Sequence, residues 1–137
     1  MKTEIFVNLP VKDLNKSIDF FKQLGFGFNP QFTDANAACM IIGENIFAML
    51  IDEKFFRNFT KKEISDAGKT TEVIVALAVD SREKADFLAD KALASGGNFS
   101  NEPTDEGFMY GRSFQDLDNH LWEVIYMDPT VVNPVQY

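Results

Sequence analysis

The 137-residue chain carries 13 Lys and Arg against 21 Asp and Glu, which gives a formal net charge of −8 at pH 7. This shortage of basic residues argues against nucleic acid and anionic membranes as partners, because both attract a basic surface. The chain lacks an apolar run of about 18 residues, the length that a membrane-spanning helix needs. Hydrophobic residues make up 45% of the sequence, enough for the core of a single soluble domain.

The compartment is indicated by the start of the chain and by its cysteine content. The apolar part of MKTEIFVNLPV is too short for a secretory signal. The single cysteine, Cys39, excludes an internal disulfide and suits a reducing cytoplasm. We therefore expect a cytoplasmic protein in which Cys39, within the apolar stretch AACMIIG, is a buried and inert thiol.

The first half of the sequence predicts one strand, one helix and three further strands. EIFVNLPV (4–11) alternates and is rich in β-forming residues. Asp13 is placed as the N-cap of a helix over 14–24, which Gly25 ends. Strands are then expected at 27–34, 37–43 and 45–52.

A polar segment at 53–70 separates the two halves. Thr60 and Glu63 have the spacing of a capping box, and Phe59 and Ile64 that of a hydrophobic staple. This pattern predicts a short helix at about 61–67.

The second half repeats the order of the first. A strand is expected at 71–79, followed by a helix that Ser81 caps and that Gly96 and Gly97 end. Strands should follow within 98–104, 107–115 and 120–127. The order β-α-β-β-β therefore occurs twice, and such an internal repeat is informative about the fold. The tail, 128–137, contains two prolines and is expected to be an irregular arm.

With this repeat, FVNLPVKDLNKSIDFFKQLGF and GRSFQDLDNHLWEV resemble the vicinal oxygen chelate superfamily, which includes glyoxalase I, bleomycin and fosfomycin resistance proteins and extradiol dioxygenases. The resemblance covers residues 4 to 127. It implies an α+β fold of two βαβββ modules, about 4–52 and 71–127, forming one domain whose curved mixed sheet surrounds a cleft. It also implies a homodimer and, in the enzymes, a divalent metal that the substrate chelates through two neighbouring oxygens.

The metal ligands of the superfamily lie on the first and fourth strands of each module. The resemblance places these four positions at Phe6, Met49, Ile74 and Glu123. Phe and Ile have no donor atom, and a thioether is too soft for Mg²⁺ or Mn²⁺ in an oxygen-rich site. Glu72 precedes Ile74 by two residues and is the nearest substitute ligand. Glu72 and Glu123 together would supply two carboxylate ligands, fewer than the three or four protein ligands of a typical catalytic site. No metal cofactor is therefore expected.

Glu123 is the strongest candidate for chemistry. Strand alternation puts Leu121, Glu123 and Ile125 on one side and Trp122 on the other. A carboxylate in an apolar cleft must be paired, shifted in pKa or bound to a ligand. Glu123 could therefore act as a general base or polar anchor, or simply pair with Arg112 or be exposed at the mouth of the cleft.

Other residues are candidates for binding the ligand. Tyr110 and Arg112 share one face of 109–114, and the sequence leaves open whether that face lines the cleft. Arg112 could bind an anionic group there, or form a structural ion pair. Asn8 could contact the ligand or bond to neighbouring backbone. Phe6, Phe47, Met49 and Ile74 would give the cleft an apolar lining, or serve as plain core.

The stretch DLDNHLWEV holds the only histidine of the chain, His120. Asp116 to His120 reads as a hairpin turn, because Asp118 and Asn119 tolerate left-handed backbone geometry. Asn119 stands where the resembled family usually has glycine. His120 therefore leaves the turn and is not expected to bind a metal.

Three hypotheses follow. The first is a glyoxalase/bleomycin-resistance-like protein that binds a small molecule in an apolar cleft without the family's metal. The second is a metal-dependent lyase or dioxygenase resembling glyoxalase I. The third is a non-catalytic interaction protein that uses the same fold. The sequence leaves the identity of the ligand, and whether the protein is an enzyme, undecided.

Overall fold

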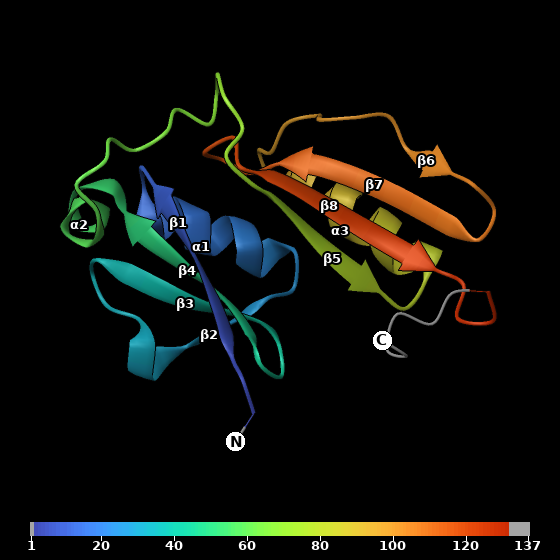
Figure 1. The fold of residues 1–137 in the computed structure, drawn as a ribbon, viewed down its shortest axis with the longest axis horizontal. Helices are drawn as coiled ribbons and strands as arrows, with labels where there is room; N and C mark the ends of the chain where they lie inside the picture. Colours follow the sequence, from blue (N-terminus) through green and yellow to red (C-terminus); the bar gives the residue numbers. More distant parts are fainter. Residues whose placement is uncertain (1, 132–137) are drawn as a thin grey trace. The chain divides into compact units, whose positions relative to one another are not determined.

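A computed structural model describes residues 2–131 of the chain. The fold consists of two compact units that divide between Thr70 and Thr71. Each unit contains a four-stranded mixed sheet and a helix packed against it (Figure 1). Within the described residues, none of the helices has the length and apolar character needed to cross a membrane.

The first unit follows the expected order. Its elements are β1 (Ile5–Val11), α1 (Leu14–Gln23), β2 (Gly27–Asn29), β3 (Ala37–Gly43) and β4 (Ile46–Asp52). The strands lie in the order β1-β4-β3-β2, with β1 parallel to β4 and the other pairs antiparallel. A parallel partner for β1 requires a crossover, which α1 and the following strands provide.

Helix α1 begins and ends where its sequence directs. The Asp13 side chain accepts a hydrogen bond from the backbone N–H of Lys16, which caps the helix. Gly25 has a φ of +100° and follows the helix, a conformation that glycine adopts without strain. The buried face contains Phe20, Phe21 and Leu24, which pack toward β3 and β4.

The second unit repeats this arrangement. Its elements are β5 (Ile74–Val79), α3 (Arg82–Ala94), β6 (Thr104–Asp105), β7 (Met109–Gln115) and β8 (Leu121–Met127). The strand order is β5-β8-β7-β6, and β5 is parallel to β8. The prediction of two βαβββ units in an α+β fold is therefore confirmed.

Alternation along β8 divides its side chains between two environments. Trp122 and Val124 are buried, on the side of the sheet that α3 covers (Figure 1). Glu123 and Ile125 point to the other side, which we call the open face of the second unit. The expected division of this strand is confirmed, because side chains of a strand alternate between its faces.

The short helix predicted at 61–67 is wrong. The helical segment instead lies earlier, as α2 (Glu53–Phe56) and a 3₁₀ turn at Arg57–Phe59, and the Asp52 side chain caps it. The Thr60 hydroxyl accepts from the N–H of Lys62 and thus closes a turn, so no capping box forms. An isolated seven-residue helix is too short to be stable without an apolar face to pack.

Three of the predicted strands are shorter than expected by three residues or more. The strand at 27–34 ends at Asn29, where Pro30 begins a 3₁₀ turn. The segment 98–104 forms an isolated bridge between Asn98 and Gln115 and pairs regularly only from Thr104. The strand expected from residue 71 begins at Ile74. Of the expected irregular arm at 128–137, residues 132–137 lie outside the described part.

Candidate functional site

The two ligand positions assigned to the first unit carry apolar side chains in adjacent strands. Met49 on β4 is paired with Asn8 on β1, and Phe6 precedes Asn8 by two residues. The Phe6 ring stacks on Phe47, with 4.7 Å between centroids, and Phe6 is 44% exposed. Among these four side chains, the amide of Asn8 and the soft thioether of Met49 hold the only heteroatoms. This donor set does not suit a hard divalent metal.

The second unit has the same geometry with one difference. Glu123 on β8 is paired with Ala76 on β5, and Ile74 precedes Ala76 by two residues. Glu123 thus occupies the position equivalent to Met49, and Ile74 the position equivalent to Phe6. Glu72 lies in a bend before β5, so strand alternation does not place it on the face of Ile74. Across residues 2–131, no three His, Cys, Asp or Glu side chains gather closely enough to hold a metal ion.

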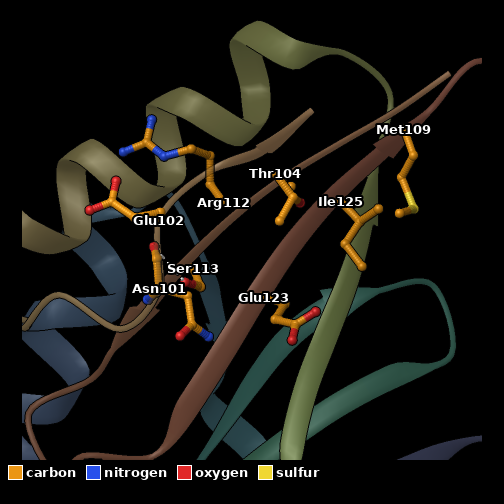
Figure 2. Close-up of a pocket in the computed structure, with 9 residues that line it drawn as sticks. Asn101, Glu102, Thr104, Met109, Arg112, Ser113, Glu123 and Ile125 are labelled. Carbon is orange, nitrogen blue, oxygen red and sulfur yellow. Dashed lines mark hydrogen bonds between the residues drawn. The ribbon is translucent and has the colours of Figure 1, made fainter. Parts of the chain in front are cut away.

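A small pocket of about 120 Å³ opens beside Glu123 on the open face of the second unit. Figure 2 shows Glu123 and Ile125 reaching it from β8, Ser113 and Met109 from β7, and Glu102 from the segment before β6. The pocket is smaller than the roughly 300–1,000 Å³ of typical small-molecule sites. It can therefore enclose a head group but not a whole drug-sized ligand.

Residues that sequence reasoning missed make up much of this pocket. The sequence predicts strands over 98–104 and 107–115 but does not decide which face of the second lines the site. In the sequence, the alternation of Met109, Gly111 and Ser113 indicates that these three residues share one face of the strand. The missed residues are Asn101, Glu102, Thr104, Met109, Ser113 and Ile125.

The carboxylate of Glu123 is available for a ligand. Its cross-strand neighbours are Ala76 and Ser113. The Ser113 hydroxyl already accepts from the N–H of Asn101 at 3.0 Å and donates to the Asn101 carbonyl at 3.3 Å. Within residues 2–131, Glu123 has no ion pair or side-chain hydrogen bond. Any partner of this half-buried carboxylate must therefore come from outside the described residues.

The face that carries Tyr110 and Arg112 is turned to α3, which decides the question that the sequence left open. Arg112 binds the carboxylates of Asp86 and Asp90 on α3, each at 2.8 Å. The Tyr110 hydroxyl donates to Asp86 at 2.6 Å, and this hydrogen bond holds the pKa of Asp86 below its ordinary value. The guanidinium of Arg112 is therefore not placed to bind an anionic ligand on the open face. It forms a structural ion pair instead, with Asp86 and Asp90 and not with Glu123.

A second arginine fastens the β6–β7 connection to the start of α3. Arg82 donates two hydrogen bonds to Asp105, at 2.8 and 3.0 Å, and one to the carbonyl of Gly107. The bonds from Arg82, with a further one from the Gly107 N–H, lower the pKa of Asp105 to about 2. The connection that borders the pocket is thus held by charge-assisted bonds, which are stronger than neutral ones.

The turn before β8 is organised by a buried carboxylate. Asp116 is 2% exposed and accepts from the N–H groups of Asp118 and His120 and from the indole Nε1–H of Trp122, at 2.9, 3.0 and 2.9 Å. Burial raises the pKa of Asp116, while the donors and nearby His120 oppose the rise. Asn119 has a φ of +67°, so the predicted hairpin turn is confirmed. Sequence reasoning did not identify Asp116 as the residue that holds it.

These observations define an α+β protein built from two βαβββ units with a retained acidic position on β8. A model of the Glyoxalase/Bleomycin resistance protein/Dioxygenase superfamily matches residues 5–124. The chain belongs to this superfamily.

Solved structures agree with this assignment. A hypothetical protein from S. aureus is 34% identical, with 92% of this chain and 95% of that chain covered and a TM-score of 0.77. A glyoxalase/bleomycin resistance protein/dioxygenase family enzyme from Burkholderia phytofirmans is 16% identical, with 89% and 96% covered and a TM-score of 0.73. A fosfomycin resistance protein from Listeria monocytogenes is 20% identical, with 92% and 93% covered and a TM-score of 0.65. Among curated proteins, none matches the chain.

Proposed function

We propose that this protein binds a small molecule on the open face of its second unit, with Glu123 as the polar anchor and without the metal of its enzymatic relatives. The single observation that carries the proposal is the carboxylate of Glu123. It lines a pocket and has no partner among the described residues. A half-buried carboxylate that has no protein partner is free to form a charge-assisted hydrogen bond with a ligand.

The chemistry of the other three positions supports the absence of a metal. Phe6 and Ile74 offer no lone pair, and Met49 offers only a thioether sulfur. One carboxylate alone gives too few ligands to hold a catalytic divalent ion against water. The same three side chains would instead contribute apolar contact area to a bound organic molecule.

The proposal also covers the compartment and the oligomeric state of the protein. We expect a cytoplasmic homodimer, on the model of the superfamily. If a reaction occurs, Glu123 is the group that could accept a proton from the ligand, because it is the acidic side chain on this face of β8. Size-exclusion chromatography with light scattering would measure the oligomeric state.

Metal analysis of the purified protein tests the proposal directly. Wild type should retain substoichiometric metal after dialysis against Ni²⁺, Mn²⁺ and Fe²⁺ in turn. Tight, stoichiometric binding that disappears in Glu123→Gln would overturn the metal-free proposal and favour the alternative of a metal-dependent lyase or dioxygenase.

The matched control is Glu106→Gln, which removes the same charge from an exposed residue of the same unit that lies outside the pocket. A metal bound equally by wild type and by both variants would be nonspecific and would leave the proposal standing. Failure of all small molecules to shift pocket resonances in NMR spectra would instead favour a non-catalytic interaction protein.

A further inference from the structure

The net negative charge of the protein comes entirely from its second unit. Residues 71–137 contain four Lys and Arg against twelve Asp and Glu, whereas residues 1–70 contain nine of each. The whole formal net charge of −8 therefore comes from the unit that carries Glu123 and the pocket. A field of one sign attracts ligands of the opposite charge and repels those of the same charge.

Both arginines of this unit are already neutralised. Arg82 is engaged by Asp105, and Arg112 by two carboxylates of α3. Arg112 is the only basic residue among those that line the pocket. Its guanidinium points toward α3 in Figure 2. The pocket thus offers no uncommitted cation to an anionic ligand.

The pocket instead offers the carboxylate of Glu123, which reaches it from β8 (Figure 2). Glu102 lines the pocket from the segment that precedes β6, with its carboxylate turned toward α3 in Figure 2. Neither carboxylate has an ion pair or side-chain hydrogen bond within the described part of the chain. Asn101 adds an amide, and Met109 and Ile125 close the remaining wall with apolar atoms. Such a lining suits a small group that donates hydrogen bonds and carries positive charge.

We propose that the pocket beside Glu123 binds the protonated amine of a cationic small molecule whose apolar part lies outside the pocket on the open face. The inference rests on the proposed function and specifies the class of its ligand. The size of the pocket agrees with an ammonium head group, because about 120 Å³ cannot enclose a larger ligand. Repulsion by Glu123 and by the net negative charge of the unit disfavours carboxylate and phosphonate ligands.

Three probes that share one apolar body test this inference: naphthylmethylamine, naphthylmethanol and naphthoate. Each is titrated into the labelled full chain, and the backbone amide resonances of Ser113, Glu123 and Ile125 are followed by NMR. The amine should shift these resonances and bind about tenfold more tightly than the alcohol, the ratio expected for one charge-assisted hydrogen bond. Naphthoate should bind more weakly than the alcohol.

Three variants with the same net charge separate contact at the pocket from the general field. Glu123→Gln should bring the affinity for the amine close to that for the alcohol, whereas Glu102→Gln and Glu106→Gln should each retain the preference. Equal loss in all three variants would show that the field alone attracts the amine, and would overturn the inference.

The remaining outcomes distinguish this inference from the function on which it rests. If the alcohol or naphthoate binds the pocket as tightly as the amine, the charge preference is wrong and small-molecule binding stands. If none of the probes shifts the pocket resonances, both proposals fail.

Discussion

Replacement of Asp116 by alanine should destabilise the second unit strongly. The substitution removes the acceptor of three N–H groups, including the indole N–H of Trp122, which is 1% exposed. A buried donor left without a partner costs about 1–3 kcal/mol. The indole donor lies at the upper end of that range, while the two backbone donors lie nearer the surface and can reach water. We expect a loss of about 3 kcal/mol, a large part of the roughly 5–15 kcal/mol of a typical domain.

Urea unfolding measures this loss, because Trp122 is the only tryptophan and its fluorescence reports on the turn and on β8. The midpoint should fall while the slope of the transition stays the same, since the area exposed on unfolding is unchanged. Glu106→Ala is the control, an exposed carboxylate of the same unit. A loss for Asp116→Ala within about 0.5 kcal/mol, the range of ordinary surface substitutions, would refute the reasoning.

Three further changes have defined outcomes. Arg112→Leu should lower the free energy of unfolding by about 1–2 kcal/mol, because it leaves two partly exposed carboxylates of α3 without their cation, and should spare binding of the amine probe. Asn119→Ala should cost about 1 kcal/mol at its positive φ, whereas Asn119→Gly should be nearly neutral. Arg82→Gln should raise the pKa of Asp105 from about 2 toward 3.8, as carboxyl NMR titration would show.

Each of these has an outcome that would contradict it. Loss of amine binding with unchanged stability in Arg112→Leu would move this arginine from structure to ligand recognition. Equal stability of the alanine and glycine variants at residue 119 would remove the argument from backbone strain. Because the pKa of Asp105 is lowered in the fold, the stability from its pair with Arg82 is present above pH 3.8 and lost as the pH falls through about 2. A melting temperature of Arg82→Gln that matches wild type at neutral pH would show that the exposed pair contributes nothing.

The elements that local sequence specifies were predicted closely. The side chains of Asp13 and Ser81 cap α1 and α3 as expected, and Gly25 and Gly96 follow these helices with positive φ. Strand 37–43 has the predicted bounds. Caps and glycine stops act over three or four residues, so their signal is complete in the sequence.

The failures share one physical cause. The Thr60 and Glu63 pattern has the right spacing for a helix, but a short isolated helix needs tertiary packing that the segment does not receive. The segment 98–104 has only two β-forming residues, Phe99 and Thr104, and most of it is fixed by single contacts such as the hydrogen bond from Gln115 Nε2 to the carbonyl of Phe99. Local propensity is a weak guide where neighbouring elements decide the conformation.

The candidate site likewise combines features that local sequence sets with features that only packing sets. The sequence alone determined the repeated βαβββ order, the turn at Asn119 and the alternation that sets Glu123 opposite Trp122, because strand and turn geometry are local. Only the tertiary structure decided that Arg112 faces α3 and that Glu102 shares a pocket with Glu123. Those facts depend on which face of β7 the helix covers and on how 98–104 approaches the sheet. Both are set by the packing of elements distant in sequence, which no local pattern encodes.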